Sequence, residues 1–170
     1  MKNLLKAVMA FAIIIMAGCG GTSVSGETYE TEVLSVLVPE GWKAFPYYQA
    51  GSQEVIPGTV GIRKGATDIN DQMRTPGLLI AITKRTNLIT ISKSSFADGE
   101  DVEPFQMGKY TWTGIKGTFS LGSTVTPMIM VQTLNEGYNY RVDFILEGSG
   151  KKISMDDADV KAIIQSITVK

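Results

Sequence analysis

The sequence has 170 residues, with 16 lysines and arginines against 17 aspartates and glutamates. The formal net charge of −1 leaves no basic excess to attract phosphate backbones, so no nucleic-acid partner is expected. The chain contains no histidine, which excludes Ser-His-Asp and Cys-His catalysis and removes the commonest ligand of zinc and copper sites.

An apolar run near the amino terminus has the properties of a secretion signal. Lys2 and Lys6 precede it, and residues 7–17 (AVMAFAIIIMA) then contain no polar side chain. A helix that spans a bilayer needs about 20 apolar residues, so this shorter run is typical of a signal peptide and not of a permanent transmembrane helix.

The run ends in Met16-Ala17-Gly18-Cys19, which resembles a bacterial lipobox with methionine in place of the usual leucine. The resemblance implies that the chain is cut between Gly18 and Cys19, that residues 1–18 are a lipoprotein signal peptide, and that Cys19 carries palmitate and related lipid. The lipid would anchor the protein to the outer face of the cytoplasmic membrane, or to the outer membrane of a host that has two membranes. The alternative is an ordinary secreted protein whose single cysteine happens to lie near the cut.

The rest of the chain predicts one domain behind a short linker. Residues 19–28 are rich in glycine and serine and would form the lipidated amino terminus and a flexible tether, while residues 29–170 form a single domain large enough to bury its own core. Two of the 16 basic residues lie in the signal, which leaves a net charge of −3. Because acylation would consume the only cysteine, packing alone must hold the domain together.

Short strands separated by turns dominate the predicted domain. They are expected over residues 32–38, 42–45, 59–64, 78–84, 109–119, 127–134 and 138–146. The clearest alternation is in the last of these. Tyr138, Tyr140, Val142, Phe144 and Leu146 share one face there, and Asn139, Arg141, Asp143 and Glu147 share the other. The residues Asn135-Glu136-Gly137 predict a hairpin with a three-residue loop and an αL bulge.

Three other segments have less regular patterns. Residues 68–74 predict a helical turn that Thr75-Pro76-Gly77 ends, and residues 87–92 fit either a strand or the start of a helix. Residues 98–103 form an acidic stretch without the spacing of an EF-hand, so a solvated loop is favoured over a calcium site. Gly114 and Gly117 are expected at bends or bulges of their strand.

The carboxyl-terminal segment predicts an amphipathic helix. Ser154 can cap it, and Asp157 would stand at its third helical position. Val160, Ile163, Ile164 and Ile167 recur at helical spacing and form one apolar stripe for docking on a sheet.

Two short motifs resemble the Mog1/PsbP-like family, across about residues 29–169. They are Val-Pro-Glu-Gly-Trp at residues 38–42 and Ile-Ile-Gln-Ser-Ile at residues 163–167. The resemblance implies a central antiparallel β-sheet covered by helices, and the residue pattern predicts the same class. We therefore expect an α+β fold in which helices flank the antiparallel sheet and the carboxyl-terminal amphipathic helix docks on it. The family includes bacterial lipoproteins of unknown role, photosystem-binding plant proteins and GTPase-binding proteins of yeast and animals, so the fold decides little about function.

The sequence predicts no enzyme and no cofactor. It has no Walker A motif, no G-x-S-x-G, no dinucleotide fingerprint and no cluster of metal ligands. A glycosidase built on two carboxylates remains open, since the chain has 17 acidic residues, but nothing directs two of them to a common substrate.

The leading hypothesis is a non-catalytic binding or scaffolding domain that faces the extracytoplasmic side and contacts another envelope protein. Candidate interaction residues are Tyr47, Tyr48, Tyr110 and Trp112, because aromatic side chains often anchor interfaces. Tyr47 and Tyr48 follow a proline in a predicted loop, while Tyr110 and Trp112 have the alternative of packing inside the sheet. The second hypothesis is a small-ligand or calcium-binding lipoprotein. A concave apolar pocket with convergent polar groups would favour it, whereas a flat aromatic patch would favour a protein partner.

Overall fold

A computed structural model describes residues 24–49, 51–121 and 124–170. The lipobox and Cys19 lie outside these residues, as does the first half of the predicted tether, up to residue 23. Strand β1 begins at Gly26, inside the stretch that was predicted to be flexible up to residue 28. Within the described residues, no helix is long and apolar enough to cross a membrane.

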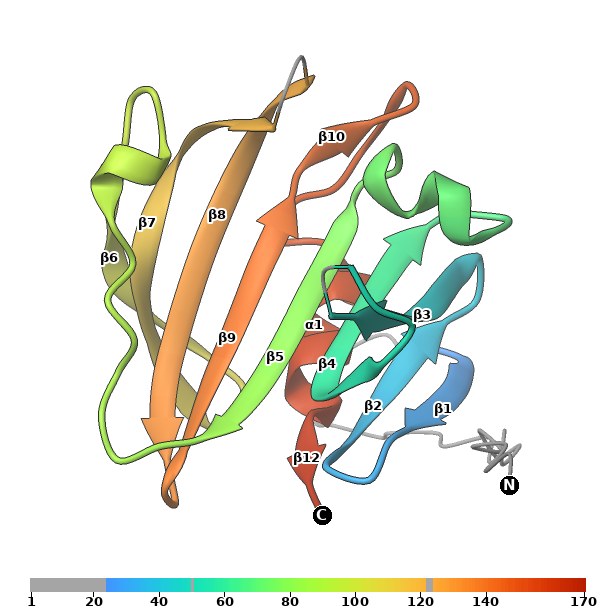
Figure 1. The fold of residues 1–170 in the computed structure, drawn as a ribbon, viewed down its shortest axis with the longest axis horizontal. Helices are drawn as coiled ribbons and strands as arrows, with labels where there is room; N and C mark the ends of the chain where they lie inside the picture. The colour runs from blue at the N-terminus through green and yellow to red at the C-terminus, as the bar shows by residue number, and fades with distance from the viewer. Residues whose placement is uncertain (1–23, 50, 122–123) are drawn as a thin grey trace.

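The described chain consists mainly of antiparallel strands (Figure 1). A seven-stranded sheet has the order β3-β4-β5-β9-β8-β7-β6, and a three-stranded sheet has the order β1-β2-β12. The strands of the large sheet are β3 (Trp42–Tyr48), β4 (Val55–Lys64), β5 (Gly77–Lys84), β6 (Glu100–Met107), β7 (Tyr110–Leu121), β8 (Thr124–Asn135) and β9 (Tyr138–Ile145). Those of the small sheet are β1 (Gly26–Glu30), β2 (Leu34–Pro39) and β12 (Thr168–Val169), and β10 (Glu147–Gly148) with β11 (Lys151–Lys152) makes a separate hairpin.

Helices are few in the described residues. They are the α-helix α1 (Ala158–Ser166) and two short 3₁₀ helices, η1 (Ile69–Met73) and η2 (Lys93–Ser95). The predicted helical turn over residues 68–74 is confirmed by η1, whose first turn Asp68 caps by accepting a hydrogen bond from the backbone N–H of Asn70. Residues 87–92, which fitted a strand or a helix, form neither.

The core lies between one face of the large sheet and a second layer made of the small sheet and α1. From the large sheet it contains Ile62, Leu78, Ile80, Val142 and Phe144, all fully buried. From the second layer it contains Leu34 and Val36 of β2 and all four residues of the predicted helical stripe, Val160, Ile163, Ile164 and Ile167. The apolar stripe is therefore confirmed as the docking face of α1. The whole of this core is built from residues between Tyr29 and Val169.

The predicted fold class is wrong, because the large sheet is not flanked by helices. Among the described residues α1 is a single α-helix of nine residues, and strands supply the rest of the second layer. Residues 26–39 form β1 and β2, and β12 follows α1 directly and pairs with β2. Three strands and one helix are enough to cover the apolar face, so the protein is predominantly β.

The start of α1 also differs from the prediction. Asp157 occupies the N-cap position and makes no side-chain capping bond, so the helix begins at Ala158. The hydroxyl of Ser154 instead accepts a hydrogen bond from the backbone N–H of Asp156, at 3.2 Å, in the turn before the helix. What holds the first turn is a tertiary contact, since Nε1 of Trp42 donates to a carboxylate oxygen of Asp159 at 2.9 Å.

The hairpin of β8 and β9 is confirmed, but its turn is tighter than predicted. Asn135 pairs with Tyr138, which leaves only Glu136 and Gly137 in the turn. Their φ angles are +51° and +78°, as a type I′ turn requires. The twist of a type I′ turn matches the twist of the two strands, so the hairpin needs no bulge.

Gly114 lies beside a bulge on its β6 side, because the register of β6 against β7 shifts between Val102, which pairs with Gly114, and Phe105, which pairs with Trp112. On its other side, β7 pairs with β8 without a register shift from Thr113 to Leu121. A Cβ atom on Gly114 would lie 1.9 Å from the carbonyl oxygen of Met130 on β8. The glycine is therefore needed where the two backbones approach closely. Gly117, the second predicted bulge, likewise lies in the unbroken part of the ladder, opposite Met128.

Candidate functional site

The face of the large sheet that points away from α1 forms a groove of about 1100 Å³. The pairing of the strands aligns the side chains on this face in rows that run across the strands. Leu79 of β5, Asp143 of β9 and Met130 of β8 make one row, and Ala81, Arg141 and Gln132 make the next. The groove is thus lined by the second face of β9, which sequence alternation had separated correctly from the core face.

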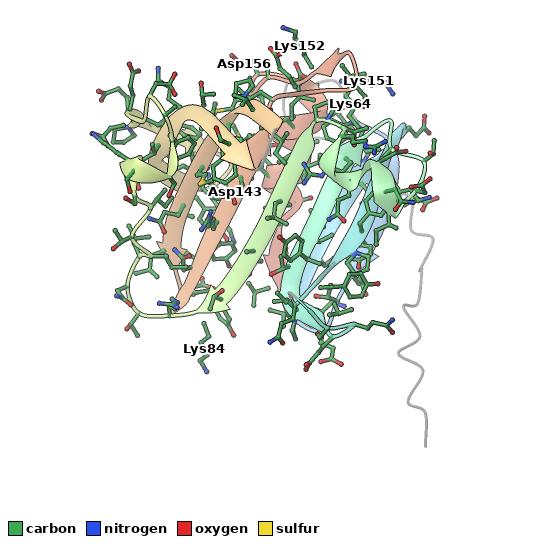
Figure 2. All side chains as sticks on the ribbon, turned by 45° about the horizontal axis from the view of Figure 1, so that its top comes forward. Lys64, Lys84, Asp143, Lys151, Lys152 and Asp156 are labelled. Atoms are coloured by element: carbon green, nitrogen blue, oxygen red, sulfur yellow. The ribbon has the colours of Figure 1, made fainter. Side chains whose placement is uncertain are left out.

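Lysine side chains lie at one end of the groove, and another lysine lies outside it. Lys151 and Lys152 of β11 line one end, where Figure 2 shows them close to Lys64. Lys84, at the end of β5, lies at the opposite end of the sheet and does not line the groove. These lysines therefore place positive charge inside and outside the groove, at separate positions.

One wall of the groove is an irregular segment, residues 85–98, which we call the strap. It runs from β5 to β6 past the edge of the sheet, in yellow-green in Figure 1. Phe96 forms a bridge with Phe119 of β7, and their rings meet edge to face with centroids 6.1 Å apart. Beneath the strap lies a second apolar cluster whose buried members are Phe96, Ile115, Met128 and Met130.

Gln132 of β8 attaches the middle of the strap to the sheet. Its Oε1 accepts hydrogen bonds from the backbone N–H of Ile89 and from Nδ2 of Asn139, both at 3.1 Å, and its Nε2 donates to the carbonyl oxygen of Ile89. One buried amide therefore satisfies both backbone groups of Ile89.

Replacing Gln132 with alanine is expected to lower the free energy of unfolding by about 1–3 kcal/mol, because it leaves these buried partners without hydrogen bonds. It should also speed amide hydrogen exchange in residues 85–98 more than in β5 or β9. Gln106→Ala, at an exposed site on β6, is the matched control and should change stability by less than about 0.5 kcal/mol. Unchanged exchange in the strap of Gln132→Ala would contradict this role.

An ion pair between the half-buried Arg141 and the buried Asp143 lies in the groove. Arg141 donates from Nε to Oδ1 of Asp143 at 2.7 Å and from its Nη2 to Oδ2 at 2.9 Å. Nη2 also lies 3.3 Å from the sulfur of Met130. Burial raises the pKa of Asp143, and the bonds from Arg141 oppose that rise. Both carboxylate oxygens of Asp143 are thus already paired within one strand.

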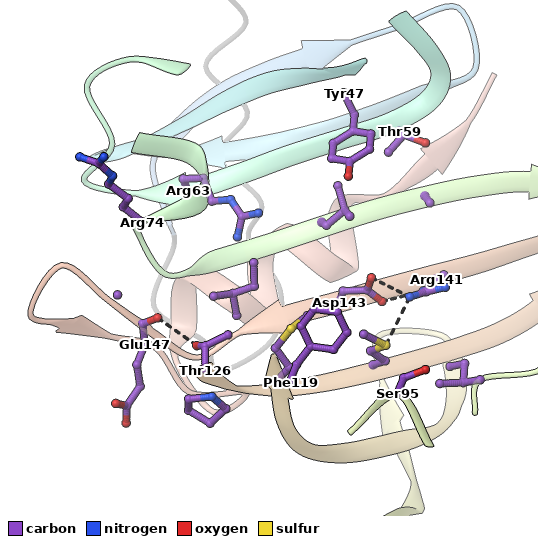
Figure 3. Close-up of a pocket in the computed structure, with 18 of the residues that line it drawn as sticks. Tyr47, Thr59, Arg63, Arg74, Ser95, Phe119, Thr126, Arg141, Asp143 and Glu147 are labelled. Carbon is purple, nitrogen blue, oxygen red and sulfur yellow. Dashed lines mark hydrogen bonds and ion pairs between the residues drawn. The ribbon is translucent and has the colours of Figure 1, made fainter. Parts of the chain in front are cut away.

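Arg63 of β4 is a buried cation in the lining of the groove, and it has no such partner. Its side chain is only 2% exposed, and neither Nε nor Nη1 has a hydrogen-bond partner among the described residues. A Cβ on Gly77 would lie 2.9 Å from Cδ of Arg63, so that glycine makes room for the arginine across β5. Burial lowers the pKa of Arg63 to about 10, which still leaves it charged at neutral pH. Figure 3 shows its guanidinium between Arg74 and Tyr47 on the wall opposite Phe119.

Another polar atom in the groove lacks a partner. Oδ1 of Asn139 is buried and accepts no hydrogen bond in the described part of the chain, although its amide nitrogen donates to Gln132. A groove that offers both a free donor, on Arg63, and a free acceptor can orient a polar ligand.

The four aromatic candidates separate into two pairs. Tyr110 and Trp112 lie in the core, with 7% and 1% of their surface exposed, and their rings pack edge to face with centroids 6.0 Å apart. They offer no surface to a partner, because alternation on β7 turns them toward the second layer. Tyr47 and Tyr48 are 37% and 40% exposed, and they lie at the end of the edge strand β3, not in a loop. Tyr47 lines the groove, and Tyr48 does not.

The acidic stretch 98–103 is not a loop as predicted, since β6 begins at Glu100 and forms an edge of the large sheet. Asp98 accepts hydrogen bonds from the backbone N–H and the hydroxyl of Thr118, and these bonds lower its pKa. Within the described ranges, no three His, Cys, Asp or Glu side chains come together to hold a metal ion.

Sequence reasoning missed Arg63 as a functional residue. The available signal was its place in the strand Val-Gly-Ile-Arg-Lys, where alternation puts it on the face opposite Ile62. A face that lies away from the core is ordinarily expected to meet water. The place of Arg63 beside Gly77 results from the pairing of β4 with β5, which no local pattern reveals.

Comparisons with known proteins found partial similarities of structure. No protein-family model matches the chain, and no curated protein matches it in sequence. A protein of Bacteroides thetaiotaomicron shares 14% identity over 81% of this chain, with a TM-score of 0.48, and this chain spans 45% of that protein's length. Cyanobacterial PsbP (CyanoP) of Synechocystis shares 16% identity over 91% of this chain and 99% of its own, with a TM-score of 0.44.

A third similar structure is LpqN of Mycobacterium tuberculosis, which is involved in cell envelope biogenesis. It shares 11% identity over 85% of this chain and 84% of its own, with a TM-score of 0.39. At TM-scores below 0.5, none of these similarities identifies a ligand, a partner or an activity for this chain.

Proposed function

We propose that this protein is a non-catalytic, lipid-anchored domain that binds a small ligand in the groove on the large sheet. The observation that carries the proposal is the groove itself, about 1100 Å³ of concave, largely apolar surface whose lining includes Arg63, a buried cation without a hydrogen-bond partner on Nε or Nη1 in the described chain. Pockets for small ligands combine an apolar lining with a few polar groups that fix orientation, and their volumes reach about 1000 Å³. The anchor is supported by the sequence Met16–Cys19, and the absence of histidine supports a binding role over catalysis.

Contact with another envelope protein is a second candidate function, and it has a different site. Strand β3 is an edge of the large sheet and carries the exposed Tyr47 and Tyr48. An edge strand offers unpaired backbone groups to which a partner can add a strand, and neighbouring tyrosines can supply contact area. The groove takes precedence because it is concave and its lining includes a buried cation without a partner on Nε or Nη1 in the described chain.

The proposal is tested by ligand-induced stabilisation of residues 20–170, which hold the entire described core. Melting temperatures would be measured with calcium, cell-wall fragments, small metabolites and amphiphiles. A ligand at 100 times its dissociation constant adds about 2.7 kcal/mol, which should raise the melting temperature of a domain this size by about 5–10 °C.

Matched variants locate the effect in the groove. Ala81→Trp fills the floor of the groove and should abolish the shift, whereas Thr111→Trp, at an exposed position on β7 outside the groove, should preserve it. A panel without any shift, or a shift that Ala81→Trp leaves intact, would overturn the proposal.

A further inference from the structure

We infer that the ligand of this groove is an amphipathic anion, whose carboxylate or phosphate head pairs with the guanidinium of Arg63 while its apolar body lies along Met128 and Met130. This inference rests on the proposed function and names the chemical class of ligand for the same site. It is carried by three properties of the groove, which are a buried cation without a partner, an excess of positive charge and an adaptable apolar lining.

The first property is the unpaired charge of Arg63. A buried cation is costly unless it is paired, and proteins ordinarily pair such groups or keep them in water. The nearest anionic candidate, Asp143, contributes to keeping Arg63 charged but accepts its hydrogen bonds from Arg141. Two of the three guanidinium nitrogens of Arg63 consequently lack partners, and an anion that enters the groove can supply them.

The second property is the charge of the lining. Five cationic side chains line the groove in the described chain, against two carboxylates: Arg63, Arg74, Arg141, Lys151 and Lys152 against Asp143 and Glu147. The groove therefore carries an excess of three positive charges on a chain whose net charge is −1. A concave surface of one sign concentrates ligands of the opposite sign, so this arrangement favours anions and disfavours cations.

The third property is the apolar part. Met128 and Met130 lie side by side on β8, with Phe119 of β7 and Ile91 of the strap packed around them. Methionine side chains are flexible and polarisable, which lets them follow the shape of an aliphatic chain. Because this apolar part and the cationic part belong to one groove, a ligand with both characters can fill it.

The experiment uses four amphiphiles with the same dodecyl chain and different heads. Binding of dodecanoate, dodecyl phosphate, dodecanol and dodecyltrimethylammonium to residues 20–170 would be measured by titration calorimetry at neutral pH. Both anions are expected to bind at least tenfold more tightly than the alcohol or the cation, and the tighter of the two identifies the head group.

Three variants test the role of Arg63. Arg63→Met should weaken both anions at least tenfold and leave dodecanol unchanged. Arg63→Lys should keep the preference for anions because it keeps the charge. Lys84→Met removes one positive charge outside the groove and should leave every affinity unchanged.

The melting temperature of Arg63→Met separates binding from structure. It should equal or exceed that of the natural chain, because the substitution removes an unpaired buried charge. A large fall in the melting temperature would show that Arg63 stabilises the fold. Equal affinities of the four amphiphiles, both in the natural chain and in Arg63→Met, would show that the charge of the head group does not affect binding. Either result overturns the inference, and the second leaves the proposed binding groove standing. If none of the four amphiphiles binds, the inference of an amphipathic ligand is overturned. The proposed binding groove is still tested separately, by Ala81→Trp and the wider panel of ligands described above.

Discussion

Replacing Ile163 with aspartate is expected to lower the free energy of unfolding by about 3–5 kcal/mol, which is a large part of the total stability of an ordinary domain. Ile163 is fully buried in the middle of the stripe that docks α1. The substitution removes an apolar side chain from the core and puts a carboxylate in its place, where no described cation faces it. Urea unfolding followed by circular dichroism would measure the loss.

Gln165→Asp is the matched control for this substitution. Gln165 is exposed on the same helix, so the same new charge meets water there and should cost less than about 1 kcal/mol, mainly through its place near the carboxyl end of the helix. Equal losses at positions 163 and 165 would contradict the docking of α1 through its isoleucines.

Trp112→Ala is expected to destabilise the protein by about 3–5 kcal/mol, because it empties the largest fully buried side-chain site in the described core. The indole Nε1 donates to the carbonyl oxygen of Met107 at 3.1 Å, and the ring packs against Tyr110. Removing the indole would leave both a cavity and an unsatisfied carbonyl. The urea midpoint should fall while the slope of the transition stays the same, since the surface exposed on unfolding hardly changes.

Tyr48→Ala is the control for Trp112→Ala among the aromatic residues. Tyr48 is 40% exposed on the edge strand β3, so its loss should change stability by no more than about 0.5–1 kcal/mol. If Trp112→Ala were equally mild, the assignment of Trp112 to the core would be wrong.

Local patterns were enough to predict most strands of the large sheet and the docking face of the helix, but not β1 or β6, whose residues were expected in a tether and a loop. The alternation in residues 138–146 separated Val142 and Phe144, which are fully buried, from Arg141 and Asp143, which line the groove. The stripe of residues 160–167 likewise needed only the helical period. These features depend on neighbours in the sequence, so a sequence can display them.

The fold class depended on contacts that local patterns do not contain. The pairing of β5 with β9 joins residues 77–84 to residues 138–145, and the pairing of β2 with β12 joins the two ends of the described chain. The expected flanking helices came from a family resemblance on two short motifs. In the structure, β1, β2 and β12 cover the sheet where those helices were expected.

The groove was unpredictable for a related reason. Its polar residues come from three strands, and whether a polar face meets water or a cavity depends on what covers it. The strap has no regular pattern of its own, and Gln132 attaches it across 43 residues of sequence. The exposure of Tyr47 and Tyr48, in contrast, follows from their place after a proline at a strand end.

The position of β2 between β1 and β12 governs the order in which the chain can fold as it is made. Ser35 and Leu34 acquire their partners, Thr168 and Val169, only after residues 36–167 have been synthesised. Nζ of Lys170 then reaches a carboxylate oxygen of Glu30 at 2.7 Å, and α1 covers the core at the same late stage. A chain that emerges from its amino end therefore cannot complete the three-stranded sheet or cover its core before residues 158–169 have been made.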